Sequence, residues 1–342
     1  MERKALMPPK SWKNQNTHYL KAVESDWYRL LVDLEDLITT ETYNFYKLKG
    51  MKTMHLPITT GSISSPIGRG SDSSPVKIKI DGVETYLADS MQFMLEYGCR
   101  LTSNGCYYIM PSFRGEKADS RHLCQFYHSE AEIPGKLDDV MNLVEEYIKF
   151  LTSKILENYG EVLEDNLFDI SHLKILTSKG YSFKKITFDD AEKFLKRKHP
   201  KTINQYVEYH NGWRDITKKA EKELVSEYGI VWVCKYDDLT VPFYQAIDSD
   251  GKAFNADLLM GIGEVVGCGQ RHMDYTQVIK SLNRHGVNKN QYKWYLEMKK
   301  HYPLQTSGFG MGTERFLMWV LDGTDIRDFQ ICVRFNGRKI IQ

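Results

Sequence analysis

Residues 307–315 read SGFGMGTER, and residues 316–321 continue the chain as FLMWVL. The alternating glycines leave room for the backbone to approach a ligand closely. The apolar residues recur at helical spacing, which predicts a helix with one buried face that ends near Gly323. Arg315 would lie in the first turn of this helix, where a fixed cation can hold an anion. The same pattern is also typical of a glycine-rich turn before a buried helix, so its meaning depends on the rest of the chain.

The overall composition excludes several classes of protein. The chain has 342 residues and a net charge of +1, so it has no general attraction to nucleic acid or to an anionic membrane. No stretch approaches 18 consecutive apolar residues and the first residues lack an apolar signal segment, so we expect a cytoplasmic protein that does not bind a membrane. The six cysteines show neither a C-x-x-C pair nor zinc-ligand spacing, which argues against a disulfide framework and a structural metal.

Hydrophobic periodicity divides the chain into predicted elements. We expect helices over residues 17–49, 137–158, 273–285 and 288–301, strand hairpins over residues 76–87 and 106–133, and short strands over residues 54–58 and 241–247. Residues 1–16 predict a flexible leader. Residues 165–227 are rich in lysine and predict a small helical insertion. Residues 59–75 are rich in Gly, Ser and Pro and predict a loop, either disordered or closing over a site.

Positive side chains gather at the ends of the second predicted hairpin. Arg114 ends its first strand, and Arg121 and His122 precede its second. Arg114 offers a bidentate fork to a phosphate oxygen, and the ring of Phe126 offers a surface for a purine. Arg315 supplies another cation, able to stack on the opposite purine face or to hold a terminal phosphate. Together these residues predict a site for a nucleoside triphosphate.

Two further polar groups complete the pattern. Asp257 and Glu264 are carboxylates in an otherwise apolar, strand-like segment, and buried carboxylates need partners such as a Mg²⁺ ion that bridges phosphates. The side chains able to orient a small zwitterion are Ser90, Gln92, Glu96 and Arg271. Each group alone could be a structural ion pair, but ATP and an amino acid as ligands explain all of them together.

These motifs resemble those of the class II aminoacyl-tRNA synthetases, in the aspartyl and asparaginyl form. Residues 113–116 (FRGE), with RHL at 121–123 and Phe126, resemble motif 2, and residues 308–315 resemble motif 3. The helix leading to Pro57 is similar to motif 1, which forms the dimer. Residues 263–271 (GEVVGCGQR) are similar to the segment between motifs 2 and 3 of asparaginyl enzymes. Over roughly residues 20–335, the resemblance implies an α+β fold with an antiparallel sheet flanked by helices, and a homodimer.

The resemblance also implies roles for individual residues. Arg114, Glu116 and Arg315 would be catalytic, with Arg114 on the α-phosphate. Arg121 and His122 would contact the outer phosphates of ATP. Phe126 and Arg315 would contact the adenine and the γ-phosphate. Asp257 and Glu264 would bind Mg²⁺. Ser90 and Gln92 would receive the α-amino side of the amino acid, and Arg271 its side-chain carbonyl or carboxylate.

Departures from the family pattern concern the amino acid. Aspartyl enzymes place a lysine where this chain has Leu95, and asparaginyl enzymes place a glutamate where it has Glu96. A carboxylate at position 96 can accept hydrogen bonds from a carboxamide and would repel a second carboxylate, so the pocket is expected to take asparagine. Gln125 and His272 also depart from the usual residues.

The expected function follows from these features. Asparaginyl enzymes carry an N-terminal OB-fold that reads the anticodon, and about 16 residues before the first helix cannot form one. We therefore expect ATP-dependent activation of asparagine, or a close analogue, with transfer to an acceptor other than tRNA. Alternatives are a tRNA ligase that uses the acceptor stem and the basic run at 193–201, synthesis of asparagine from aspartate, and an inactive sensor of amino acid or ATP.

Overall fold

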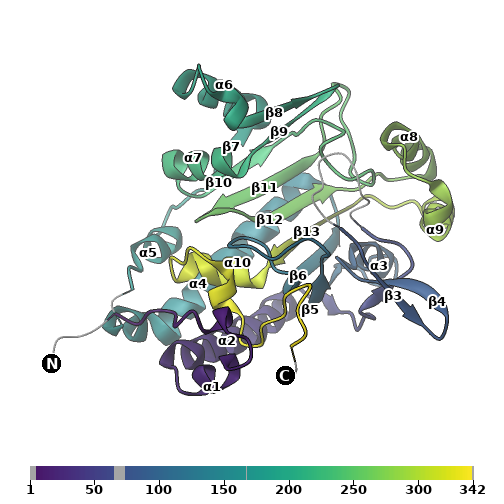
Figure 1. The fold of residues 1–342 in the computed structure, drawn as a ribbon. Coiled ribbons are helices and arrows are strands. Elements are labelled where there is room, and N and C mark those ends of the chain that lie inside the picture. The colour runs from purple at the N-terminus through teal and green to yellow at the C-terminus, as the bar shows by residue number, and fades with distance from the viewer. Residues whose placement is uncertain (1–4, 65–73, 167, 341–342) are drawn as a thin grey trace.

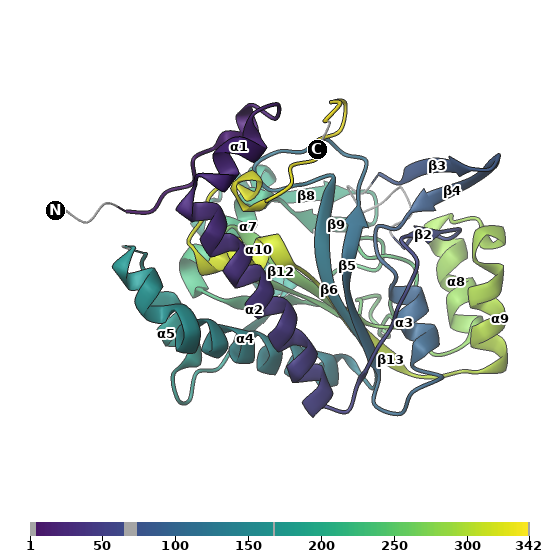
Figure 2. The ribbon, with the colours of Figure 1, turned by 90° about the horizontal axis from the view of Figure 1, so that it is seen from below.

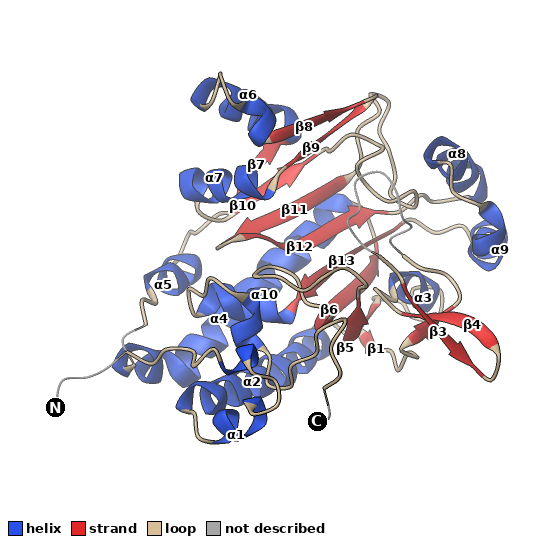
Figure 3. Ribbon diagram, viewed as in Figure 1, coloured by secondary structure: helices blue, strands red, loops and turns tan. Residues whose placement is uncertain are grey.

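A computed structural model describes residues 5–64, 74–166 and 168–340. Its centre is an eight-stranded sheet with the order β1-β5-β6-β13-β12-β11-β10-β7 (Figures 1 and 3). The strands are β1 Lys52–Thr53, β5 Cys106–Phe113, β6 Gln125–Pro134, β7 Lys184–Thr187, β10 Val231–Cys234, β11 Asn255–Met260, β12 Gly263–Gln270 and β13 Thr306–Gly312. The inner pairings are antiparallel, and the edge strands β1 and β7 pair in parallel. The predicted α+β class and the mainly antiparallel sheet are thus confirmed.

Long helices cover one face of the sheet (Figure 2). Helix α4 (Leu137–Asp165) lies against β11, β12 and β13, and α2 (Asp26–Leu48) packs on α4. The apolar side chains of both helices join those of α10 (Thr313–Val320) and α5 (Ser171–Thr177) in the largest hydrophobic cluster. None of the described helices is both long and apolar enough to cross a membrane.

A smaller layer lies beside the sheet. It contains α3 (Gln92–Gly98), α8 (Tyr275–His285), η3 (Lys289–Tyr292) and α9 (Lys293–His301), together with a three-stranded sheet of β2 (Thr59–Thr60), β3 (Val76–Ile80) and β4 (Val83–Leu87). Phe93 of α3 contacts the rings of Phe243, Tyr292 and Tyr295. Aromatic packing therefore fixes α3 against α9. Of the loop expected over residues 59–75, residues 65–73 lie outside the described residues, and Thr59–Thr60 form β2.

The predicted helical insertion is mixed rather than helical. Besides α5, α6 (Phe188–Lys198), η2 (Ile203–Gln205) and α7 (Lys218–Tyr228), residues 165–227 contain β7 and the hairpin of β8 (Val207–His210) and β9 (Trp213–Ile216). The hairpin turns at Asn211 and Gly212, and Gly212 has a positive φ of 89°. An Asn-Gly pair is a strong hairpin signal, but the lysine-rich composition around it obscured the two short strands.

Four other local expectations were wrong. Within the expected leader, Ser11–Lys13 form a short 3₁₀ helix (η1), in which the indole of Trp12 is buried and donates to Asp328 Oδ1 at 2.7 Å. The helix expected over 17–49 divides at Ser25 into α1 (His18–Val23) and α2. The strands expected over 54–58 and 241–247 are replaced by the two-residue β1 and by isolated bridges at Gln245 and Ile247.

The glycines of residues 307–315 serve the packing of two strands. They lie in strand β13, not in a turn, with Gly308 opposite Glu132 and Gly310 opposite Glu130 of β6. A Cβ atom at Gly308 would overlap the Glu132 carboxylate, and one at Gly310 would lie 3.0 Å from Glu130 Oε1. The glycines therefore make room for two carboxylates from the neighbouring strand.

This packing predicts that Gly308→Ala lowers the free energy of unfolding by about 1–3 kcal/mol, because the added methyl group has no space. Urea unfolding followed by circular dichroism measures the effect. Gly61→Ala is the control, since a Cβ there meets no atom within 4 Å. Equal midpoints for the two variants would contradict the steric role of Gly308.

A second prediction concerns the junction of β13 and α10, where Glu314 is buried and accepts from the Tyr127 amide at 3.1 Å. Burial raises the pKa of Glu314 from 4.5 to about 8. Between these values the folded chain keeps a proton that the unfolded chain releases. The contribution of Glu314 to stability therefore falls as pH rises, by about 1.4 kcal/mol per unit. We expect Glu314→Gln to remove this slope in urea unfolding between pH 5.5 and 7.5, and parallel profiles for variant and wild type would exclude it.

Candidate active site

A cavity of about 810 Å³ lies on the sheet face opposite α4. Side chains alternate along β6 and β13, so Ala131 and Phe309 point into the core while Glu130 and Gly310 border the cavity. Its walls are completed by Ser90 and Gln92 at the start of α3, by side chains within residues 236–245 and by the β8–β9 hairpin. Of the predicted site residues, the cavity is lined by Ser90, Gln92, Arg114, Arg121, His122, Asp257, Glu264, Arg271 and Arg315, and a smaller adjoining pocket by Glu116 and Phe126. The structure thus gathers these residues from distant parts of the chain.

Three arginine side chains, Arg114, Arg121 and Arg315, gather at one end of the cavity. The guanidinium of Arg114 lies 5.5 Å from the centre of the Phe126 ring, and Arg114 is 3.9 Å from Glu116. Arg315 donates to the backbone oxygen of Glu264 at 2.8 Å. Burial, and then the charge of Arg315, lower the pKa of His122. Such a cluster fits the phosphates of a nucleotide.

Arg121 is held at this end by the insertion. Its guanidinium pairs with Glu221 of α7, which also accepts from the Glu264 amide at 3.2 Å. The Nε and Nη1 atoms of Arg121 are buried and have no hydrogen-bond partner in the described structure. Buried guanidinium nitrogens without partners fit the oxygens of an anion. Glu221 was missed by sequence reasoning, because nothing in the lysine-rich helix distinguishes it.

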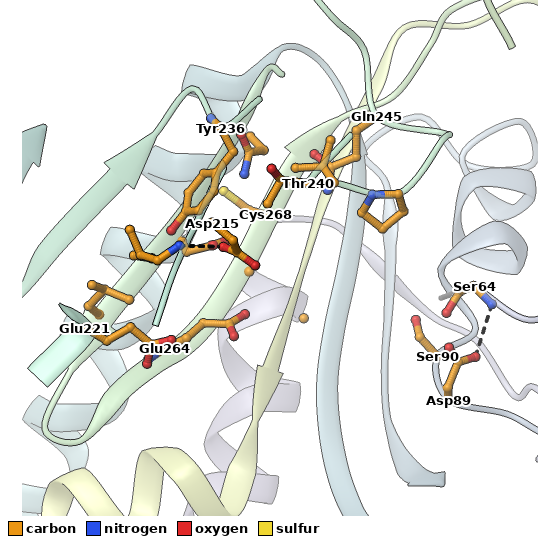
Figure 4. Close-up of a pocket in the computed structure, with 18 of the residues that line it drawn as sticks. Ser64, Asp89, Ser90, Asp215, Glu221, Tyr236, Thr240, Gln245, Glu264 and Cys268 are labelled. Atoms are coloured by element: carbon orange, nitrogen blue, oxygen red, sulfur yellow. Dashed lines mark hydrogen bonds between the residues drawn. The ribbon is translucent and has the colours of Figure 1, made fainter. Parts of the chain in front are cut away.

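The predicted metal ligands come together across a hairpin. Asp257 lies in β11 and Glu264 in β12, and a Cβ at Gly267 would lie 3.6 Å from Asp257 Oδ1 and 3.0 Å from Glu264 Oε1. Burial, and then the neighbouring Glu264, raise the pKa of Asp257 well above its usual value. Figure 4 shows Asp215 and Glu221 near Glu264. Oxygen donors that repel one another fit a hard cation such as Mg²⁺.

No group of three metal-ligating side chains occurs in the part of the chain that the structure describes. Mg²⁺ usually binds through one or two carboxylates, with water and substrate phosphates completing its shell. The pair formed by Asp257 and Glu264, beside the three arginines, has this character.

Ser90 lies at the other end of the cavity (Figure 4), where the buried carboxylate of Glu130 also lines the wall. Glu130 accepts from Ser90 Oγ at 2.6 Å and from the Tyr108 hydroxyl, and its Oε1 lies 3.0 Å from His128 Nδ1. Burial alone would raise the pKa of Glu130. However, His128 and the hydrogen bonds stabilise the charged form, so this pKa lies below its usual value. An ionised carboxylate here suits an ammonium group. Glu130 was not among the predicted binding residues.

Arg271 forms the adjacent wall. Its Nε and Nη2 donate to the two oxygens of Glu132 at 3.0 and 2.9 Å, and its guanidinium lies 5.4 Å from the Tyr244 ring centre. The bidentate pair fixes the orientation of Arg271, so that the guanidinium is a rigid donor at the cavity wall.

Glu96 is placed differently from the expectation. It is buried behind the cavity and does not line it. Tyr295 of α9 donates to Glu96 Oε2 at 2.7 Å, and the ammonium of Lys299 pairs with Oε1. Lys299 is far from Glu96 in the sequence, and no local pattern connects the two residues.

Comparison with known proteins places this geometry in a family. Residues 13–334 match the family model described as tRNA synthetases class II (D, K and N). The probable cytoplasmic asparagine–tRNA ligase of Enterocytozoon bieneusi is 34% identical over 69% of this chain, which covers 51% of that relative. The asparagine–tRNA ligase of Bacillus anthracis is 31% identical over 84% of the chain, which covers 66% of it. The chain thus spans half to two thirds of these relatives.

Solved structures share the fold. The asparaginyl-tRNA synthetase of Pyrococcus horikoshii, complexed with asparaginyl-adenylate, superimposes with a TM-score of 0.84 at 24% identity, over 98% of this chain and 74% of that one. The Entamoeba histolytica enzyme in the same type of complex gives a TM-score of 0.79 at 22% identity, over 96% and 71%. Because the family model matches most of this chain, the chain belongs to the class II tRNA synthetases of the D, K and N group.

Proposed function

We propose that the chain activates asparagine with ATP, producing an enzyme-bound asparaginyl-adenylate and pyrophosphate. The observation that carries this proposal is the polarity of one cavity. At one end, three arginines and the Asp257–Glu264 pair suit a triphosphate with Mg²⁺, and at the other, Glu130 and Arg271 suit an amino acid. The relatives named as asparagine–tRNA ligases support the same reading.

In this proposal the chemistry depends on positioning and charge. Glu130 holds the α-ammonium group and Arg271 the side-chain carbonyl, so that the carboxylate faces the α-phosphate. The carboxylate oxygen attacks phosphorus, the bond from the α-phosphorus to the bridging oxygen breaks, and pyrophosphate leaves. Arg114 and Arg315 stabilise the negative charge of the transition state. Asp257 and Glu264 would hold Mg²⁺, which supplies further neutralisation of the phosphates. No side chain has to act as a nucleophile.

The relatives favour tRNA as the acceptor. The expectation of another acceptor rested on the short segment before the first helix, not on a feature of the cavity. The chain's similarity to tRNA ligases supports the alternative, transfer of the asparaginyl group to tRNA. The basic run adds little to it, since Lys196 pairs with Glu192 and Lys198 with Glu223. The homodimer stays a prediction.

The primary test is ATP–pyrophosphate exchange across the twenty amino acids, followed by charging of bulk tRNA with the amino acid that supports exchange. We expect exchange with asparagine. Exchange with aspartate alone would favour amide synthesis, and no exchange with any amino acid would exclude the proposed activity.

Arg114→Ala is predicted to reduce exchange by about 100-fold or more, because one fixed donor to the phosphate is lost. The matched control is Arg29→Ala, which removes an exposed ion pair with Asp26 on α2. Both variants should keep the wild-type thermal unfolding midpoint. Full exchange activity in Arg114→Ala would contradict the assignment of the nucleotide site.

Asp257→Asn is predicted to raise the Mg²⁺ concentration for half-maximal exchange by about tenfold, because one of two anionic ligands is lost. A Mg²⁺ titration of the exchange rate measures this, with Asp33→Asn on the exposed face of α2 as control. An unchanged Mg²⁺ dependence would show that Asp257 does not hold the ion.

A further inference from the structure

Gln245 (Figure 4) lies beside Arg271, and both side chains line the cavity. The two residues form an antiparallel bridge. The residues that flank Gln245 make backbone hydrogen bonds with those that flank Arg271, so the bridge is a non-hydrogen-bonded pair. In such a pair the side chains approach each other most closely and share one face of the sheet. The Gln245 amide is therefore a direct neighbour of the guanidinium assigned to the amino acid.

The side-chain amide of Gln245 lies over Gly269, two residues before Arg271 in the chain. A Cβ atom at Gly269 would overlap Gln245 Oε1, so a side chain there would displace the amide. Gly269 lies opposite Gly308 of β13, which in turn lies opposite Glu132. A Cβ atom at Gly308 would overlap the Glu132 carboxylate in the same way. The Gln245 amide and the Glu132–Arg271 ion pair thus lie over neighbouring strands, on one face of the sheet.

The oxygen of this amide is unsatisfied. Gln245 Oε1 is buried and has no hydrogen-bond partner in the part of the chain that the structure describes. A buried acceptor without a donor is costly in the folded protein. Because the Gln245 side chain also lines the cavity, a ligand bound there can supply the missing donor. The neighbouring guanidinium of Arg271 has N–H donors and no acceptor, so this wall presents a donor and an acceptor next to each other.

We propose that Gln245 is a specificity-determining residue, which accepts a hydrogen bond from the side-chain NH₂ of asparagine while Arg271 donates to the carbonyl oxygen. This inference rests on the proposed function. A carboxamide carries both the donor and the acceptor that the pair requires, whereas a carboxylate carries acceptors alone. With a carboxylate in the same place, Gln245 Oε1 would face another acceptor and stay unsatisfied, which lowers the affinity for aspartate.

The competing explanation is that Gln245 only fills the space over Gly269. Methionine is similar in length and has no strong hydrogen-bonding group, so Gln245→Met separates the two explanations. A second variant addresses the amide itself, which can rotate to present its nitrogen to a carboxylate. In Gln245→Glu the ionised side chain offers acceptors alone, so it can accept from a carboxamide and repels a carboxylate.

The test measures kcat and KM in ATP–pyrophosphate exchange for the wild type and both variants, with asparagine as the substrate. Aspartate is tested as a substrate and as an inhibitor of exchange with asparagine. The KM for ATP reports on the phosphate end of the cavity, and the thermal unfolding midpoint reports on folding. Gln291→Met, at an exposed position of η3, is the matched control.

We expect Gln245→Met to raise the KM for asparagine by about tenfold, because one hydrogen bond is lost, and to leave the KM for ATP within about twofold. We expect Gln245→Glu to keep kcat/KM for asparagine within about threefold and to weaken exchange with, or inhibition by, aspartate by about tenfold. An unchanged KM for asparagine in Gln245→Met would show that the side chain fills space. An equal loss of asparagine activity in both variants would show that an acceptor is not required. Either result would overturn the inference.

The wild-type protein separates this inference from the proposed function. No exchange with any amino acid would contradict the activity itself, and exchange with aspartate alone would contradict both. Exchange with asparagine that is the same in the wild type and in Gln245→Met would contradict the role of Gln245 alone.

Discussion

The close approach of β6 and β13 is the constraint on which the site depends. Two carboxylates of β6 lie over two glycines of β13, and a side chain at either glycine would displace them. Because the register is fixed, Glu130 borders the cavity and Glu132 lies behind it. Glu132 then orients Arg271, which follows β12, and Glu130 gathers Ser90, Tyr108 and His128. A backbone feature thus determines where the charges of the amino-acid end lie.

The phosphate end is built differently, from segments that meet only in three dimensions. Arg114 and Arg121 come from the β5–β6 connection, Arg315 from the start of α10, and Glu221 from the insertion. Buried guanidinium nitrogens without partners are costly in the folded chain, and an anion would satisfy them. Each of the three arginines also has a carboxylate beside it, from Glu116, Glu221 and Glu264 respectively, so this end of the cavity holds charges of both signs.

Much of this was predictable because the chemistry resides in short, contiguous motifs. The hairpin with Arg114 and Phe126, the fold class and the helix after Gly312 follow from local periodicity and from a family resemblance. The rest depends on long-range contacts that leave no local signal. Glu96 was assigned to the substrate because its partner Lys299 is distant in sequence, and Trp12 was assigned to a flexible leader because Asp328 lies at the other end of the chain. The β8–β9 strands, four residues each, were too short to outweigh the surrounding helical composition.

The strand β7 makes the insertion part of the central sheet rather than an appendage. It covers β10, whose residues Val231–Cys234 would otherwise form an open edge. An unpaired edge of apolar residues is a template for pairing with another chain, so natural sheets keep such edges covered or charged. A shortened chain without residues 165–227 would therefore gain a surface prone to self-association, even with every residue of the cavity floor retained. The sheet then ends at β7, whose first two residues are the exposed Lys184 and Lys185.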